Sequence, residues 1–330
     1  MACYVEDVRA LLMVMLTTGV AMAKPETTAV NEKPAVEKPK PSKSSDEPPG
    51  GLLSLTDDPV FGKADRIDGD EAKNVVAFTF DDGPNPETTP AVIDALEKYD
   101  VPATFFIVTR RLEGKHGEKP REILKRQLAA GFTVGSHSIS HPNLKFASKD
   151  KLAKEIDGSI RTLSPAAGQP IGLFRFPFGA TNKLGRARVK KLGLTEAFWS
   201  VDTLDWKAKN ADKLRKTVFS MIVKQKGGVV LMHDVKPITA KIIADVLDDL
   251  EAENCQRLAA KQEPIVPVSL HYFLKDGKTA RPLPEAVLKR TETYRTNLPG
   301  RCAKRPAKPV EAPPSAPVPA PAKAAIPAKP

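Results

Sequence analysis

The sequence predicts an α/β fold in which parallel strands alternate with helices and form a distorted barrel or an open sheet. Between about residues 71 and 275, short apolar runs alternate with amphipathic stretches, and this alternation is typical of parallel strands joined by crossover helices. Unusual polar residues follow the apolar runs directly, where parallel α/β folds place their active sites. Many of the 31 prolines gather at the two ends of the chain, which predicts disordered flanking tails.

Seven apolar runs in this segment are predicted strands. They are Val75–Phe80, Ala103–Val108, Phe132–His137, Gly172–Pro177, Ala197–Asp202, Val229–His233 and Ile265–Ser269. Seven such units can form an open doubly wound sheet or a closed barrel, and periodicity does not decide between the two.

Four amphipathic stretches between the strands are predicted helices. They are Thr88–Tyr99, Lys149–Leu163, Ala211–Lys224 and Ile238–Glu251. In each, apolar residues recur at helical spacing. In the first, Thr88 and Thr89 precede Pro90, a pattern that predicts an N-cap.

Residues 1–23 are predicted to be an export signal. An apolar run from Ala10 to Ala23 ends in the small-x-small sequence Ala21-Met22-Ala23, which is typical of a cleavage site. The run is shorter than the roughly 20 apolar residues of a membrane span. Glu6 and Asp7 depart from the positive charge expected before such a run, so an uncleaved anchor or a mis-assigned start is the alternative. We expect an exported protein of the periplasm, cell envelope or extracellular space.

The flanking segments are rich in Pro, Lys, Ala, Glu and Ser. Residues 24–70 are predicted to be a disordered linker and lead-in, and residues 276–330 a C-terminal extension that is disordered from about residue 299. The formal net charge of +11 favours contact of basic tails with an anionic envelope, or serves solubility alone. No basic helix interleaved with aromatic residues is visible, so no nucleic-acid partner is expected, and we expect a monomer.

Cysteine usage leaves two possibilities open. Cleavage after Ala23 would remove Cys3 and leave Cys255 and Cys302. In an oxidising compartment these two can form a disulfide that ties the C-terminal extension to the domain, or they can remain unrelated free thiols.

Five polar clusters follow the predicted strands. They are Asp81-Asp82-Gly83-Pro84, Ser136–His141, Arg175–Gly179, Asp202–Trp206 and Leu231–Asp234. Each alone has a structural explanation, such as a tight turn or a solvated histidine pair. Together they point to chemistry, because three of the five histidines of the chain lie in them.

Asp82, His137 and His141 are the candidate metal ligands. Two histidines and one carboxylate can hold a divalent ion and leave positions open for water and substrate, as a catalytic site requires. This ligand set suits zinc, with cobalt, nickel or iron as alternatives.

The remaining charged residues supply acid–base partners. Asp81 is the candidate general base, with Arg175 keeping it ionised and oriented. His233 is the candidate general acid, if a carboxylate such as Asp205 raises its pKa. A metal site, a base and an acid are the parts needed to hydrolyse an amide or an ester.

In their order and spacing, the five clusters resemble the motifs of the polysaccharide deacetylases of carbohydrate esterase family four, which share the NodB homology domain. The resemblance spans roughly residues 74–270. It implies a distorted parallel (β/α) barrel with fewer than eight regular strands, and removal of acetyl groups from peptidoglycan, chitin-like oligosaccharides or related N-acetylhexosamine polymers. Some members of the family act on acetylated xylan.

The resemblance also implies roles for individual residues. Asp81 matches the base, Arg175 the residue that holds it, and Asp82, His137 and His141 the metal ligands. His233 matches the acid that protonates the departing amine, and Asp205 the residue that tunes it. Trp206 and Leu231 match the apolar walls around the acetyl methyl group. Phe178 supplies the backbone N–H that binds the oxyanion, at a position where many relatives carry tyrosine.

Two other functions compete with N-deacetylation. An O-acetyl esterase acting on a xylan-like polysaccharide would use the same motifs, because esters and amides pass through similar tetrahedral intermediates. A non-catalytic module that binds the cell wall through its basic tails would be expected to lack at least one motif residue, and none is missing.

Overall fold

The computed structural model describes residues 66–69, 73–273 and 285–305. The predicted export signal, the predicted linker up to residue 65 and the tail after residue 305 lie outside the described residues. Within the described part, no helix has both the length and the apolar character needed to cross a membrane.

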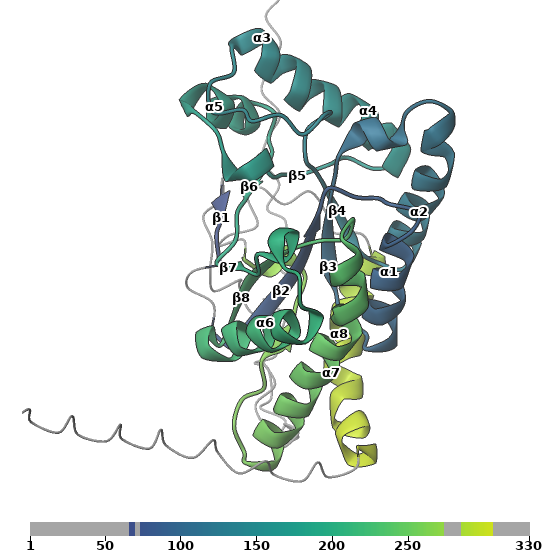
Figure 1. The fold of residues 1–330 in the computed structure, drawn as a ribbon, viewed down its shortest axis with the longest axis vertical. Coiled ribbons are helices and arrows are strands. Elements are labelled where there is room, and N and C mark those ends of the chain that lie inside the picture. The colour runs from purple at the N-terminus through teal and green to yellow at the C-terminus, as the bar shows by residue number, and fades with distance from the viewer. Residues whose placement is uncertain (1–65, 70–72, 274–284, 306–330) are drawn as a thin grey trace, which may run out of the picture. The chain divides into compact units, whose positions relative to one another are not determined.

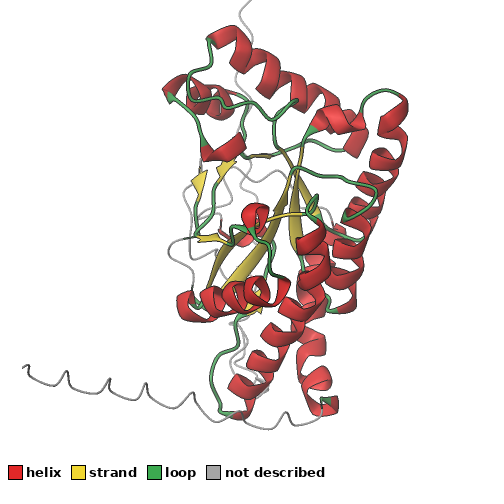
Figure 2. Cartoon of the chain, viewed as in Figure 1, coloured by secondary structure: helices red, strands yellow, loops and turns green. Residues whose placement is uncertain are grey.

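The centre of the fold is one parallel sheet that curls into a half-barrel surrounded by helices (Figure 2). Its strands follow the order β1-β6-β5-β4-β3-β2-β8-β7, and β9 pairs with β2 outside this path. The strands are β1 Arg66–Ile67, β2 Val75–Asp81, β3 Ala103–Ile107, β4 Thr133–Ser136, β5 Leu173–Phe174, β6 Thr195–Ala197, β7 Val201–Asp202, β8 Gly227–His233 and β9 Val266–Pro267. The prediction of a distorted parallel barrel is confirmed.

One predicted strand is wrong in detail. The run Ala197–Asp202 is two strands, β6 and β7, which pair with different neighbours. Between them, Phe198 N donates to Ile67 O and Ser200 N to Val229 O, so the chain leaves one edge of the sheet and joins the other. Strand β1 lies before residue 71, the predicted start of the domain. The sequence did not predict this strand, because a strand of two residues is too short to show periodicity.

In the part of the chain that the structure describes, eight α-helices flank the sheet (Figure 1). They are α1 Thr89–Lys98, α2 Glu118–Ala129, α3 Lys149–Leu152, α4 Gly158–Ala167, α5 Lys183–Lys191, α6 Ala211–Gln225, α7 Pro237–Ala259 and α8 Glu285–Lys304. A π-helical turn, Ala153–Asp157, joins α3 to α4, so the predicted helix Lys149–Leu163 is continuous. The sequence did not predict α2, α5 or α8, because few apolar residues mark their buried faces; α5 buries Gly185 and Val189.

The predicted N-cap of α1 is confirmed in position but not in its bonding. Thr88 is the N-cap residue and Pro90 lies in the first turn, yet the Thr88 side chain makes no capping hydrogen bond. Instead, the Thr89 hydroxyl accepts a hydrogen bond from Asn85 N at 2.8 Å and donates to Asp234 Oδ2 at 2.6 Å. The polar group at this helix start is therefore used to hold together two segments of the site.

Strand β2 occupies the centre of the core. All seven of its residues are buried, with β8 along one side and with β3 and β9 at its two ends on the other. Asp81, its last residue, is thus carried by a thoroughly enclosed element, which restricts the movement of its side chain.

The C-terminal extension is structured beyond its predicted limit. Helix α8 runs to Lys304, although the domain was predicted to end near residue 275 and disorder to begin near residue 299. Its Tyr294 and Leu298 are buried, and a disulfide joins Cys302 to Cys255 on α7. The structure therefore decides in favour of the disulfide over two free thiols.

Candidate active site

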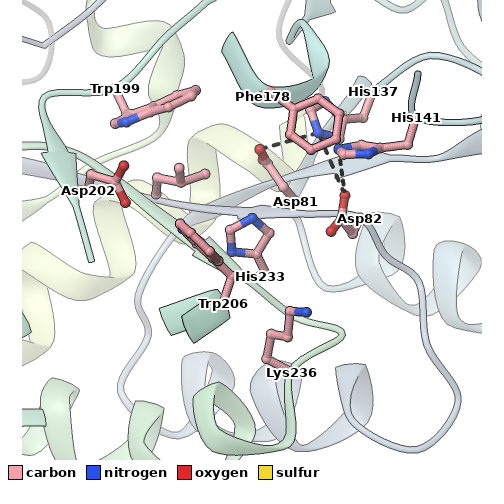
Figure 3. A pocket seen from close by; sticks show the side chains of 11 residues that line it. Asp81, Asp82, His137, His141, Phe178, Trp199, Asp202, Trp206, His233 and Lys236 are labelled. Carbon is pink, nitrogen blue, oxygen red and sulfur yellow. Dashed lines mark ion pairs between the residues drawn. The ribbon is translucent and has the colours of Figure 1, made fainter. Parts of the chain in front are cut away.

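The carboxyl ends of the strands surround a cavity of about 530 Å³ (Figure 3). Its lining residues are Asp81, Asp82, His137, His141, Phe178, Trp199, Asp202, Trp206, Leu231, His233 and Lys236. Eight of the ten predicted site residues are among them. The other two, Arg175 and Asp205, are buried and contact cavity-lining side chains from behind.

Asp82, His137 and His141 form the candidate metal centre. One donor atom from each lies within 4.8 Å of the others. Asp82 Oδ1 is 3.2 Å from His141 Nε2 and 3.7 Å from His137 Nε2, and this oxygen is buried without a hydrogen bond among the described residues. A buried carboxylate oxygen that faces two imidazole nitrogens fits a divalent cation.

The proton on His137 is placed by its neighbour. Its Nδ1 lies 2.8 Å from the carbonyl oxygen of Arg175. A carbonyl only accepts, so Nδ1 carries the hydrogen and the lone pair of Nε2 is directed at Asp82 and His141. Burial lowers the pKa of His137 to about 3, so the ring is neutral at neutral pH, as a metal ligand must be.

A buried acid supports the loop that carries His141. Glu155 Oε2 accepts hydrogen bonds from Ile139 N at 3.1 Å and Ser140 N at 2.9 Å, and its Oε1 accepts from Ser140 Oγ at 2.8 Å. Ser138 Oγ also accepts from His141 N at 3.0 Å. These bonds fix a loop in which Ser138 and His141 have φ angles of 68° and 58°, which are unfavourable for residues other than glycine.

The predicted base is paired with the predicted arginine. Arg175 Nη1 lies 2.8 Å from Asp81 Oδ1 and donates to Thr79 Oγ1 at the same distance. The guanidinium also packs over the Phe106 ring, 4.1 Å from its centroid. Burial raises the pKa of Asp81 and the positive charge of Arg175 opposes that rise, so this carboxylate, which lines the cavity, is more basic than in water.

The predicted acid is paired with the predicted tuning residue. His233 Nδ1 lies 2.7 Å from Asp205 Oδ1, which directs Nε2 into the cavity. Burial works against the charged imidazolium, but the hydrogen bond and charge of Asp205, with further help from Asp81 and Asp82, raise the pKa of His233 to about 9. The ring is therefore protonated at neutral pH and can donate.

Apolar groups form the rest of the predicted site. Leu231 is buried, whereas Trp206 and Phe178 are exposed at the rim. The Phe178 ring packs edge-on against His141 with centroids 4.5 Å apart. Phe178 adopts a φ of 61°, and its backbone N–H makes no hydrogen bond to another described residue, so it is available to a ligand.

Sequence reasoning missed several residues of the site. Trp199, Asp202 and Lys236 line the cavity. Asp202 lies in a polar cluster that the sequence had already marked, and Lys236 follows His233 by three residues, so proximity to the strand ends was a usable signal. Glu155 lies next to Ile156 on the buried side of its helical segment, and an acid in that position is a sign of a satisfied internal bond.

The comparisons with known proteins agree with this geometry. A family model described as polysaccharide deacetylase matches residues 68–197. The peptidoglycan-N-acetylglucosamine deacetylase PgdA of Listeria monocytogenes is 35% identical over 179 residues, which cover 54% of this chain and only 36% of that protein. The chitooligosaccharide deacetylase of Bradyrhizobium sp. is 34% identical over 163 residues, which cover 49% of this chain and 71% of that protein.

A solved structure is also similar. It is a peptidoglycan N-acetylglucosamine deacetylase in complex with 4-naphthalen-1-yl-N-oxidanyl-benzamide. The superposition has a TM-score of 0.53 at 29% sequence identity and covers 64% of this chain and 94% of the other. The chain thus spans nearly all of that structure but about a third of the Listeria protein.

Proposed function

Because the chain belongs to the polysaccharide deacetylase family, we propose that it is a metal-dependent hydrolase that removes acetyl groups from N-acetylhexosamine polysaccharides or oligosaccharides and releases acetate. The observation that carries the proposal is that the buried Asp81 carboxylate and the His233 imidazole, which is paired with Asp205, lie in the same cavity as the Asp82, His137 and His141 donors. Base, acid and metal centre are the parts that amide hydrolysis requires.

The three donors would hold a divalent ion, for which zinc is the proposed identity and cobalt, nickel and iron are the alternatives. When bound there, the ion polarises the acetyl carbonyl and makes a neighbouring water more acidic. The neutral state of His137 and the loop hydrogen bonds of Glu155 support this assignment, because both prepare the ligands before the ion arrives.

Asp81 is the proposed general base. Its Oδ1 is engaged by Arg175, which leaves Oδ2, 3.5 Å from His137 Nε2, to accept a proton from the attacking water. The oxygen of that water bonds to the acetyl carbon, and negative charge moves to the carbonyl oxygen. The free N–H of Phe178 is the proposed donor to that oxyanion.

His233 is the proposed general acid. As the bond between carbon and nitrogen breaks, Nε2 transfers its proton to the sugar nitrogen, so acetate and a free amine result. An amine is a poor leaving group unless it is protonated, and the paired carboxylate of Asp205 keeps the donor charged until that moment. Leu231 and Trp206 are the proposed apolar surfaces beside the acetyl methyl group.

Peptidoglycan and chitin-like oligosaccharides are the proposed substrates, because relatives named for each are similar to this chain. An exported location is proposed with them. It is supported by the disulfide between Cys255 and Cys302, since disulfides persist in oxidising compartments. We also propose that the basic tails contact the anionic envelope.

Acetate release from a panel of substrates tests the proposal. The full chain, loaded in turn with zinc, cobalt, nickel and iron, would be offered peptidoglycan, chitin oligosaccharides and acetylated xylan. Acetate from the first or second supports N-deacetylation. Acetate from xylan alone would establish the O-acetyl esterase instead, and no acetate from any substrate with any of the four ions would reject hydrolysis.

A further inference from the structure

A second cleft, of about 350 Å³, lies beside the candidate metal ligands. It is lined by Asp82, Val108, Arg110, Arg111, Ser140 and His141. Asp82 and His141 also line the main cavity, so the two spaces meet at these two side chains. A substituent carried close to the acetyl group of a substrate can therefore reach the second cleft, which we call the arginine cleft.

The walls of the arginine cleft are held by hydrogen bonds between two loops. Thr109 N donates to Ser138 O at 3.1 Å, and Arg110 N donates to Ile139 O at 3.0 Å. The same 138–140 segment is fixed on its other side by Glu155. The backbone that carries the arginines is thus tied to the backbone that carries His141, so the cleft is preformed rather than assembled by a ligand.

Neither arginine of the cleft forms an ion pair with a carboxylate among the described residues, and the buried Asp234 carboxylate interacts with Arg111 only beyond ion-pair distance. Arg111 uses Nε to donate to the carbonyl oxygen of Asp82 at 2.5 Å, and its two terminal nitrogens make no further hydrogen bond or ion pair in that part of the chain. The exposed Arg110 side chain makes none there either. The Asp82 carboxylate is directed at the two histidines, and Glu155 uses both oxygens on its own loop and Lys151.

Two guanidinium groups next to a cation-binding centre create a local positive potential that favours an anion. Their planar donor groups match a carboxylate, which they can bind through two parallel hydrogen bonds. We infer that the arginine cleft binds a carboxylate carried by the substrate beside the acetylated sugar, and thereby selects an acidic glycan over a neutral one. This inference rests on the proposed function and names a substrate class for it.

Two parts of an acidic cell-wall glycan carry such a group. One is the lactyl ether of a muramic acid unit, and the other is the amino acids attached to it. Three probes separate them: chitotetraose, which is neutral; a peptide-free oligosaccharide of N-acetylglucosamine and N-acetylmuramic acid; and the same oligosaccharide with its peptide. The quantity to compare is kcat/KM on each acidic probe divided by kcat/KM on chitotetraose.

Arg110→Gln is the test variant, because the side chain is exposed and its loss leaves the backbone bonds of the loop intact. We expect the ratio to fall about fivefold, the value of one exposed charge pair near 1 kcal/mol. Arg110→Lys should recover part of the loss. Lys213→Gln, an exposed lysine on α6 that lines a separate groove, is the charge-matched control and should leave the ratio unchanged.

The pattern of loss identifies the carboxylate. A fall with both acidic probes assigns the lactyl group, and a fall with only the peptide-bearing probe assigns the peptide. An unchanged ratio in Arg110→Gln, or an equal change in Lys213→Gln, would overturn the inference. Calorimetric titration of the peptide-bearing probe into wild type and into Arg110→Gln measures binding affinity without turnover. Weaker binding by the variant would support the inference, and equal binding would reject it. This result does not depend on whether acetate is released.

Discussion

The carboxylate of Asp205 holds His233 through two separate bonds: Oδ1 lies 2.7 Å from Nδ1 of the ring, and Oδ2 accepts from the backbone N–H of the same residue at 2.7 Å. The Thr239 hydroxyl donates to Oδ2 as well, at 2.5 Å. These bonds fix the His233 ring in position before substrate binds, and the negative charge of Asp205 stabilises the imidazolium form of that ring. The pKa of His233 rises from 6.5 to about 9 as a result.

Asp205→Asn should move the alkaline limb of the pH profile. In the wild type, kcat should decline as pH rises through about 9, because His233 then loses the proton that it must donate. Without the charge of Asp205 the pKa of His233 falls, so the decline should begin at least one pH unit lower. The profile of kcat against pH from 5 to 11 measures this, with Thr239→Val as a control that removes only one hydrogen bond and should shift the limb less.

Asp205→Asn should also change how the free energy of unfolding depends on pH. A histidine whose pKa is raised on folding stabilises the native state fully below its unfolded value, and that contribution is lost as pH rises through the folded value. The difference in unfolding free energy between wild type and Asp205→Asn should thus narrow between pH 6.5 and about 9. Urea denaturation at both ends of that range would show it. A pH-independent difference, together with an unshifted alkaline limb, would mean that Asp205 does not tune His233.

Asp81→Asn should reduce turnover by about two to four orders of magnitude, the usual contribution of a general base. The amide cannot accept the proton of the attacking water, yet it is close in shape to the carboxylate beside Arg175. Since Asp81 is not among the three donors, bound metal should persist, as elemental analysis of the purified variant would show. Asp212→Asn, an exposed acid at the start of α6, is the control. Wild-type turnover by Asp81→Asn would refute the role of this residue.

His137→Ala should lose metal and activity together, because the ring supplies one of three donors. His116→Ala, which removes an exposed histidine outside the site, should lose neither. Glu155→Gln should weaken metal affinity by about 10-fold, since residues behind the ligands typically contribute that much. Competition with a chromogenic chelator gives the affinities. Retention of full metal content by His137→Ala would exclude this ligand set.

The strand ends made much of the site predictable. Asp81, His137 and His233 each lie at or directly after an apolar run, and parallel strands bring such positions to one edge of the sheet. Supporting contacts were not predictable in the same way. Thr239 reaches Asp205 from 34 residues away, and Thr89 reaches Asp234 from 145 residues away, so neither pairing leaves a local pattern in the sequence.

The fold shows the same division. Buried strands such as β2 are continuous apolar runs, so the sequence predicts them. The break between β6 and β7 was not predictable, because it depends on which strand accepts the hydrogen bond of each backbone N–H between them. Helix α8 was missed because lysine and arginine are frequent in it and Pro299 lies within it. Its position depends on long-range anchors, including Tyr294 bonded to Asn254 and the disulfide to α7.

Gly83→Ala should damage both stability and the metal centre. A Cβ at residue 83 would lie 2.1 Å from Oδ2 of Asp234, which is fully buried and bonded to Thr89, so either that carboxylate or the turn that carries Asp82 must shift. We expect a loss of about 1–3 kcal/mol in unfolding free energy, the usual cost of overpacking, together with weaker metal binding. Gly172→Ala, where an added Cβ meets nothing within 4 Å, is the matched control. Equal behaviour of the two variants would show that the turn tolerates the shift.

Cys302→Ser should destabilise the protein without abolishing its chemistry. The disulfide closes a loop with a sequence separation of 47 residues, and removing such a crosslink typically costs about 2–4 kcal/mol. Cys255 lies near the C-terminal end of α7, whereas His233 precedes the N-terminal end of the same helix, so turnover at 25 °C should be close to that of the wild type. Thermal unfolding and acetate release, measured on the same preparations, test both statements. Cys255→Ser should lose as much stability as Cys302→Ser, and the double variant should lose no more, because the two cysteines form one bond. A loss of activity at unchanged stability would contradict this prediction and would indicate that α8 supports the site directly.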